Sequence, residues 1–477
     1  MDENKGIAMM GHRGREAWRK VAFTPLILVA LGPGCVPGLA TDVPPEMMVF
    51  DPQGSPPLVP TPSFLAMNPT TGKIDLSSAG IDVPADCQAQ KAIPIAQCEF
   101  FQYLESLDGF PTLTPAQAPA SAALDMGTVK VPDNLFVYNA ATSQALTTDA
   151  LRVEVRPTDS AHSLSIDPKK GWDRGGMYFI SVRGYEKGIR AQSGLDVVSS
   201  PIYFLLKKDE SLACNTEPPA LVSPKQCPYY QVIAKPGKTQ EEVSASLFSL
   251  EKLRRTLRSL GPARIDAWNL IGTAGKMAKE EVAIFWVFPT HSSPVAEVDP
   301  SRGLVPEIVD DQTLRIAVKG TVKGDTVSRL VPLVGKSGTV LLLDLTELKE
   351  ATSDLGRLGA FLMIDPSYES GSITVKLSAS SLTPGHQYAI FLTHGITDDA
   401  ERPLVPSPLT VLLRSRGPLV EDGKSTVSGV AYDQALQIEG GRKELAQLLD
   451  NESFVSSTGL SRDKIAYIYA FQHGGGN

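Results

Sequence analysis

The 477-residue sequence lacks several features that would point to a definite chemistry. It has no basic excess, because 53 acidic residues outnumber 45 Lys and Arg and the net charge is −8, and nucleic-acid binding requires a basic face. No block of like charges marks an interaction tail. The sequence contains no G-x-S-x-G motif and no C-x-x-C, and no histidine stands at zinc-ligand spacing. It therefore predicts no nucleic-acid partner, no metal, no cofactor and no catalytic site.

An export pattern occupies the N-terminus. Basic residues between positions 13 and 20 precede an eleven-residue apolar run over residues 21–31, and small residues lead from there to Cys35. This is the pattern of a signal peptide, whereas a membrane-spanning helix takes about 20 apolar residues. An uncleaved anchor and a buried core segment are the alternatives.

Cleavage before a cysteine resembles the signal of bacterial lipoproteins. That resemblance implies that Cys35 carries a lipid and that the membrane is a partner through this anchor. Gly32 stands where the resembled signal has a large aliphatic residue, so plain secretion is the alternative. Pro and Gly are frequent over residues 36–62, and such a composition predicts a semi-extended tether.

The other four cysteines form two close pairs, Cys87 with Cys98 and Cys214 with Cys227. Four cysteines allow three pairings, and we expect the local one because the partners are near in sequence. Each bond would restrict the unfolded chain by roughly 3 kcal/mol in the loop-entropy description. Disulfides indicate an oxidising compartment. A zinc site is the competing interpretation, and no histidine supports it.

The same order of elements occurs twice along the chain. A turn and strand are followed by a Pro-led apolar run expected to be a strand, then a helix, then an aromatic closing strand. The first copy has these elements at residues 172–180, 201–206, 243–257 and 282–288, and the second at 382–390, 408–413, 436–449 and 465–471. A repeated order is stronger evidence than a single match. Further strands are expected at 135–138, 151–155, 314–318 and 339–345.

The stretch of residues 382–388, with the pattern L-x-P-G-x-x-Y, resembles the tyrosine corner of Greek-key sandwiches, in which the Tyr hydroxyl bonds to the turn backbone. The resemblance implies a structural role for Tyr388 and, in the first copy, for Tyr178. The expected fold is mainly β, with two Ig-like β-sandwich modules in tandem, each carrying a short helical appendage and a return strand.

A wider family resemblance is carried by residues 59–65, 68–74 and 104–110 and by the closing aromatic strands. Together they resemble bacterial Ig-like domains of the S-layer type, as found in extracellular lipoproteins. They are also similar to the N-terminal region of surface-exposed lipoprotein lipases of Gram-negative bacteria. Thr61 and Ser63 replace the Phe and Asp of that family's opening proline motif. The resemblance implies an outer-membrane or cell-surface location.

Other candidate sites have an ordinary structural interpretation beside the functional one. A calcium site or a solvated turn is suggested by the acidic residues Asp398, Asp399 and Glu401, and again by Asp310 and Asp311. A metal pair or two surface histidines are suggested by His386 and His394, and a carbohydrate platform or core packing by Phe285, Trp286, Tyr467 and Tyr469. Catalytic loops or plain turns are suggested by residues 335–338 and 473–476. For each set we favour the structural interpretation, since the spacing of a known motif is missing.

The expected organisation is a signal peptide over residues 1–35, a tether over 36–62, modules over 63–292 and 293–473, and a tail over 474–477. The expected function is that of a non-catalytic cell-envelope lipoprotein with a structural or binding role, its ligand being an unidentified protein or polysaccharide. One alternative is the N-terminal, non-catalytic part of an extracellular lipase or esterase whose hydrolase domain lies beyond Asn477. Another is a soluble periplasmic binding module.

Overall fold

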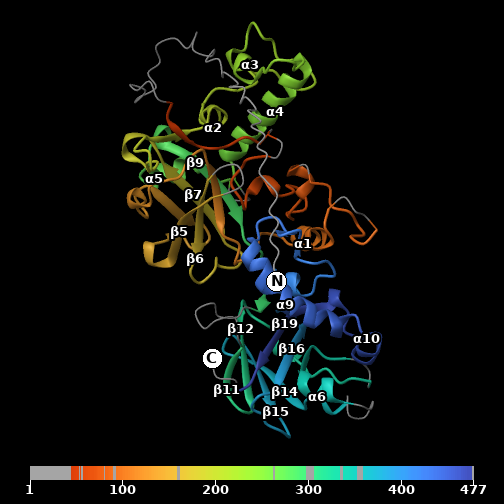
Figure 1. Cartoon of the computed structure of the whole chain (residues 1–477). Helices are drawn as coiled ribbons and strands as arrows, with labels where there is room; N and C mark the ends of the chain where they lie inside the picture. The colour runs from red at the N-terminus through yellow and green to blue at the C-terminus, as the bar shows by residue number, and fades with distance from the viewer. Residues whose placement is uncertain are drawn as a thin grey trace, which may run out of the picture. The chain divides into compact units, whose positions relative to one another are not determined.

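The computed structural model describes residues 44–52, 54, 57–79, 81–89, 93–157, 162–260, 264–296, 306–333, 337–351 and 358–474. The predicted signal peptide, Cys35, residues 36–43 of the predicted tether and residues 475–477 of the predicted tail lie outside the described residues. The described chain is rich in β-strands, and these form several sheets (Figure 1).

The N-terminal part of the fold contains two sheets within the described residues. Its strands are β1 (Glu46–Met48), β2 (Ala116–Ala120), β3 (Leu135–Asn139), β4 (Gln144–Ala145), β5 (Leu151–Pro157), β6 (His162–Pro168), β7 (Met177–Arg183), β8 (Val197–Ser199) and β9 (Val282–Pro289). One sheet has the order β5-β6-β2-β1-β8 and the other the order β4-β3-β7-β9. Both sheets contribute to one buried cluster, to which Ile166 of β6 and Ile180 of β7 belong.

The C-terminal part of the fold also pairs two larger sheets, as far as the structure describes it. Its strands are β10 (Val295–Ala296), β11 (Glu307–Asp310), β12 (Thr313–Lys319), β13 (Val340–Asp344), β14 (Ile364–Glu369), β15 (Ser372–Leu377), β16 (Gln387–Thr393), β17 (Val420–Glu421), β18 (Lys424–Ser425) and β19 (Ile465–Gln472). The orders are β10-β12-β15-β14, with β11 on β12, and β13-β16-β19. Ile373 of the first and Ile390 of the second share a buried cluster.

Helices accompany the sheets, and in each part at least one of them packs against a sheet. They are α1 (Ile95–Ser106), α2 (Pro201–Leu206), α3 (Pro228–Ile233), α4 (Gln240–Leu257), α5 (Ala267–Thr273), α6 (Leu345–Glu350), α8 (Pro408–Leu413), α9 (Tyr432–Leu449) and α10 (Glu452–Thr458). Tyr203 of α2 donates a hydrogen bond to the carbonyl of Phe285 on β9 (3.0 Å). Leu445 of α9 packs with Phe391 of β16. In the described chain, no helix is both long and apolar enough to span a bilayer.

Burial on both faces explains why the closing strands β9 and β19 have nearly continuous apolar sequences. β9 is buried at seven of its eight positions, and β19 at its first four and again near its end. A strand covered on both sides carries a continuous apolar run, whereas a strand with one solvated face alternates. The predicted return strands at 282–288 and 465–471 and the predicted helices at 243–257 and 436–449 are confirmed as β9, β19, α4 and α9.

Two of the predicted strands are helices. Residues Pro201–Leu206 form α2 and residues Pro408–Leu413 form α8. Ser200 and Ser407 stand at the N-caps, and each accepts the backbone N–H three residues later. Serine is a favoured N-cap, and a proline in the first helical position has its φ already set and needs no N–H partner. The Ser-Pro start therefore outweighs the strand-like composition.

The tether prediction is wrong for part of its length. β1 pairs in parallel with β8 and antiparallel with β2, and Met48 and Phe50 belong to the buried cluster of the N-terminal part. Thr61 forms backbone hydrogen bonds with Gln117 of β2. Residues 47–50, Met-Met-Val-Phe, are an apolar run inside a Pro- and Gly-rich stretch, and the burial of Met48 and Phe50 keeps this stretch within the fold.

A buried Glu–Arg pair fixes the long helix α4. The side chains of Glu251 and Arg254 are 6% and 9% exposed, and an Arg254 nitrogen lies 2.7 Å from a Glu251 oxygen. The other Glu251 oxygen accepts the backbone N–H of Leu212 (2.9 Å), while Arg254 donates to the carbonyl of Asp209 (3.0 Å). The pair therefore holds the segment after α2 against α4.

The helix α9 repeats this arrangement. Arg442 lies 2.8 Å from Glu439, and both side chains are buried. Glu439 accepts the backbone N–H of Leu419 (2.9 Å), and Arg442 donates to the carbonyl of Ser415 (3.3 Å). The two parts thus share a Ser-Pro helix, a long helix with a Glu-x-x-Arg clamp and a closing strand, in the same order.

The helix α1 connects the N-terminal part to the C-terminal part. Its Glu99 carboxylate accepts hydrogen bonds from the hydroxyl of Ser415 (2.7 Å), and its Tyr103 hydroxyl donates to the carbonyl of Pro406 (2.8 Å). Ala96 of the same helix packs with Leu419 in a small buried cluster. The two parts belong to one compact unit.

Candidate functional site

Both disulfides fasten a loop to a helix. Cys87 and Cys98 are bonded with their Cα atoms 5.6 Å apart, and Cys98 lies in α1. Cys214 and Cys227 are bonded with their Cα atoms 5.5 Å apart, and Cys227 is the residue before α3. Each bond joins two consecutive cysteines of the chain, 11 and 13 residues apart, as in the predicted local pairing. The fifth cysteine, Cys35, is the predicted lipidation site and lies outside the described residues.

The two tyrosines singled out by the repeat have the same geometry. The Tyr388 hydroxyl accepts the backbone N–H of Thr383 (2.7 Å), and the Tyr178 hydroxyl accepts that of Asp173 (2.7 Å). Both rings are buried. Burial raises the pKa of each hydroxyl above its usual range, so both remain protonated and can also donate. Each hydroxyl thus bonds to the turn five residues earlier.

The acidic turns are engaged by protein groups. Asp398 is buried, pairs with Arg402 (2.8 Å) and accepts the backbone N–H groups of Ala400 and Arg402. Asp310 accepts the N–H of Gln312 in a hairpin turn. No cluster of three His, Cys, Asp or Glu side chains suited to a metal occurs in the part of the chain that the structure describes. Asp398 therefore acts as the partner of an arginine.

The histidines each have a partner of their own. His386 lies 2.7 Å from Asp344, and hydrogen bonding to that carboxylate raises the pKa of His386. His394 lies 2.7 Å from the carbonyl of Leu404, and burial lowers its pKa. His473 lies 3.1 Å from Asp311. His386 and His394 therefore have separate partners and do not form a metal pair with each other, and both are half-buried, so the prediction of surface histidines is wrong.

The glycine-containing strings have structural roles where they are described. Gly338 adopts a φ of +122°, and a Cβ there would lie 2.3 Å from the carbonyl oxygen of Arg329, so the turn admits glycine only. Gly474 also has a positive φ, of 66°. The remaining residues of these strings, 335, 336, 475 and 476, lie outside the described residues.

The motif at residues 107–110 is explained by a close approach of two backbones. A Cβ on Gly109 would lie 2.4 Å from the carbonyl carbon of Thr290, at the end of β9. Beside it, Asp108 accepts the backbone N–H of Ser292 (2.9 Å). The glycine permits the contact and the aspartate fixes it. This part of the family-like pattern therefore serves packing.

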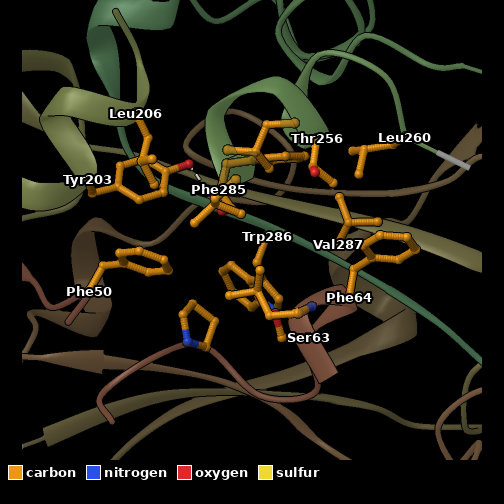
Figure 2. Close-up of a pocket in the computed structure, with 14 residues that line it drawn as sticks. Phe50, Ser63, Phe64, Tyr203, Leu206, Thr256, Leu260, Phe285, Trp286 and Val287 are labelled. Atoms are coloured by element: carbon orange, nitrogen blue, oxygen red, sulfur yellow. Dashed lines mark hydrogen bonds between the residues drawn. The ribbon is translucent and has the colours of Figure 1, made fainter. Parts of the chain in front are cut away.

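A narrow apolar pocket lies between β9 and the helices above it (Figure 2). Its volume is about 30 Å³, enough for about two or three water molecules by the usual measure of about 10–15 Å³ each. Phe50, Phe64, Tyr203, Phe285 and Trp286 are among the side chains that line it. The pocket is a packing gap in the core and is too small for an organic ligand.

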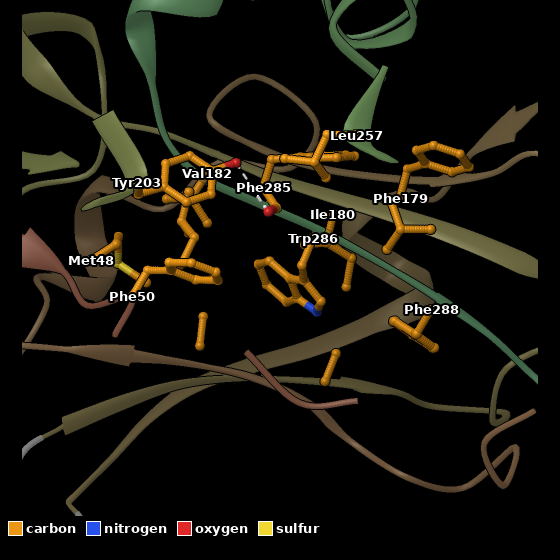
Figure 3. Packing of buried hydrophobic residues seen from close by; sticks show 14 of the residues in the cluster. Met48, Phe50, Phe179, Ile180, Val182, Tyr203, Leu257, Phe285, Trp286 and Phe288 are labelled. Atoms are coloured by element: carbon orange, nitrogen blue, oxygen red, sulfur yellow. Dashed lines mark hydrogen bonds between the residues drawn. The ribbon is translucent and has the colours of Figure 1, made fainter. Parts of the chain in front are cut away.

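The aromatic residues proposed as a platform are core residues. Phe285 and Trp286 are 2% and 3% exposed, and they leave β9 in different directions, Phe285 towards Tyr203 and Leu257 (Figure 3). Tyr467 is also buried, while Tyr469 is half-buried. Flat stacking of a sugar needs an exposed ring face. Phe285, Trp286 and Tyr467 therefore do not form a carbohydrate platform.

A larger cleft lies where α1 meets the C-terminal part. Its volume is about 630 Å³, within the roughly 300–1,000 Å³ typical of small-molecule sites. Its charged and titratable lining comprises Lys73, Arg402, Arg414, Arg416, Arg462, His394, Glu99, Asp108, Asp463 and Tyr103. Arginine and lysine outnumber carboxylates in this lining, although the whole chain is acidic. This cleft is therefore a candidate site for a small ligand.

The cleft was not predictable as a site because its residues are far apart in the sequence. Lys73 and Glu99 come from the start of the N-terminal part, whereas Arg414 and Arg462 follow α8 and α10. Only the docking of α1 brings them together. The local signal, two arginines flanking one serine at residues 414–416, has no motif spacing that points to a ligand.

Comparisons with known proteins give little similarity. No protein-family model matches the chain, and no curated protein sequence matches it. One solved structure, of surface layer protein SbsC, domains 1–6, aligns at 16% identity and a TM-score of 0.17, covering 37% of this chain and 19% of that one. A crystal structure of the S-layer protein rSbsC aligns at 9% identity and a TM-score of 0.15, covering 62% and 32%. The chain thus spans less than a third of either, and these scores support no inference about its fold or function.

Proposed function

We propose that this chain is a non-catalytic lipoprotein of the bacterial cell envelope, anchored through Cys35 at the outer membrane or cell surface. The observation that carries the location is the pair of disulfides in a chain whose first 35 residues have a signal pattern ending at a cysteine. Structural disulfides persist in oxidising compartments outside the cytoplasm. The role is structural or binding, with a protein or polysaccharide as the partner.

The folded body of this lipoprotein is two Ig-like sandwich modules in tandem, over residues 63–292 and 293–473. The paired sheets and the two tyrosine hydroxyl-to-turn bonds support this interpretation, because the tyrosine corner is characteristic of Greek-key sandwiches. Within the described residues, β1 adds a strand that precedes the first proposed boundary.

Palmitate labelling tests the anchor. Cells that express the full chain are grown with radiolabelled palmitate, and the wild type is compared with Cys35→Ala and with Gly38→Ala as a matched control. We expect label in the wild type and in Gly38→Ala and none in Cys35→Ala, which should also leave the membrane fraction. Equal incorporation in Cys35→Ala would exclude lipidation at this residue.

A second candidate is the N-terminal, non-catalytic part of an extracellular lipase or esterase. The observation in its favour is the resemblance carried by residues 104–110. The two candidates differ in what the gene encodes after the codon for Asn477. A frame that continues into G-x-S-x-G with downstream Asp and His supports the lipase; a stop codon supports the lipoprotein.

A further inference from the structure

We propose that the cleft beside α1 is a binding site for a small anionic ligand, and that Arg414 receives its phosphate or carboxylate group. This goes beyond an envelope role, because it names the chemistry of a ligand. It does not depend on lipidation of Cys35. The two proposals can therefore fail separately.

The other arginines of the cleft already have carboxylate partners. Arg402 pairs with Asp398 (2.8 Å), Arg416 with Glu99 (3.1 Å) and Arg462 with Asp450 (2.8 Å). In contrast, no carboxylate of the described residues lies within ion-pair distance of Arg414. A guanidinium without a carboxylate, in a cleft of ligand size, is available for an anion from solution.

Arg414 is held in position before any ligand arrives. One of its terminal nitrogens, Nη1, donates to the carbonyls of Arg462 (3.0 Å) and Ile465. In return, Arg462 donates to the carbonyl of Arg414 (2.6 Å). The Nε and Nη2 groups of Arg414 have no hydrogen-bond partner among the described residues, and neither is enclosed. This leaves one edge of a fixed guanidinium for bidentate contact with a planar anion.

Partial burial of the Arg414 guanidinium favours the binding of an anion. Burial is the largest influence on Arg414 and lowers its pKa, although Glu99 raises it. An arginine stays charged at any physiological pH, so a partly dehydrated guanidinium gains more from an anionic partner than an exposed one does. Arg414 in turn lowers the pKa of His394, after the larger effect of burial, which keeps that neighbour neutral.

The carboxylates of the lining are occupied elsewhere. Glu99 accepts hydrogen bonds from the hydroxyl of Ser415 and from Arg416, and Asp108 accepts from Ser292. Hydrogen bonding to Ser461 lowers the pKa of Asp463. Lys73 stands exposed in the same lining and supplies a second cation. A ligand with two acidic groups matches this pair.

The test is a titration of the full chain, in detergent, with inorganic phosphate and with citrate at constant ionic strength set by chloride. We expect both to raise the melting temperature and to bind saturably in calorimetry. Arg414→Gln should weaken phosphate binding roughly tenfold or more, because it removes charge-assisted hydrogen bonds to the anion. Arg315→Gln, an exposed arginine of β12 outside the cleft, is the matched control and should bind like the wild type.

Lys73→Gln keeps the proposal testable if Arg414→Gln does not fold, since Lys73 is exposed and its loss should weaken citrate binding several-fold without unfolding the protein. Flotation with phosphatidylglycerol and phosphatidylcholine vesicles separates the sources of the anion. Phosphate binding without vesicle binding identifies a free anion. Flotation with phosphatidylglycerol that Arg414→Gln abolishes identifies a headgroup. No phosphate-specific shift, or the same shift in every variant, would overturn the proposal.

Discussion

Glu251 should make the stability of this protein fall steeply in acid. Burial raises the pKa of this carboxyl, but hydrogen bonds from Arg254, Arg255 and the backbone N–H of Leu212 outweigh that effect and lower the pKa from 4.5 to about 2. Because the pKa is lower in the folded protein than in the unfolded chain, ionisation favours folding. The stabilisation is complete above about pH 4.5 and is lost as the pH falls towards 2. A difference of this size corresponds to about 3 kcal/mol.

The prediction is measured by urea unfolding of the wild type and Glu251→Gln between pH 7 and pH 2. We expect the variant to be less stable by about 3 kcal/mol at pH 7, since it leaves Arg254 buried without its partner. The difference should shrink towards zero near pH 2, where the wild-type carboxyl is protonated. Glu241→Gln, an exposed acid in the first turn of the same helix, is the control and should change little.

Other acids also titrate in this range, so only the difference between the two proteins reports on Glu251. If that difference stayed constant from pH 7 to pH 2, the destabilisation would come from something other than the charge. If Glu251→Gln were within about 1 kcal/mol of the wild type at pH 7, the clamp would not hold the segment after α2, and the reasoning would be refuted.

Two further changes test the packing. Tyr388→Phe removes the acceptor for the Thr383 N–H and should lower the free energy of unfolding in urea by about 1–3 kcal/mol. Tyr467→Phe, the control, removes a buried hydroxyl that has no partner among the described residues and should leave this free energy unchanged. Equal losses of stability in the two variants would contradict the tyrosine-corner role of Tyr388. Gly109→Ala should lower the melting temperature through a clash worth roughly 1–3 kcal/mol. Gly324→Ala meets open space, and a Gly109 variant as stable as this control would refute the close approach.

Long patterns in the sequence predict the elements well, and short ones do not. The spacing of Val243, Leu247 and Leu250 specifies a helix because it repeats over several turns of α4. A six-residue apolar run such as Pro201–Leu206 has no such repeat, and strand and helix fit it equally. The serine before the proline decides between the two, because it caps the N-terminus of a helix.

Tertiary relations are beyond the reach of those patterns. Glu251 and Arg254 read as an ordinary exposed pair on a helix, and only the packing of the Leu212 segment buries them. The cleft depends in the same way on α1, whose Glu99 and Tyr103 contact residues more than 300 positions later. The composition of residues 36–62 as a whole also masks its short apolar run, which is why the strand and buried residues within 46–50 were not predicted.

The docking of α1 gives the protein a second path for mechanical load. A pull on the C-terminal part would reach Tyr103 through its bond to Pro406 and Glu99 through its bond to Ser415. Between those residues and the start of the helix stands Cys98, which is covalently tied to Cys87. Tension would therefore enter the N-terminal part at a cross-linked helix as well as along the main chain, and shear would have to break several contacts at once before the two parts could separate.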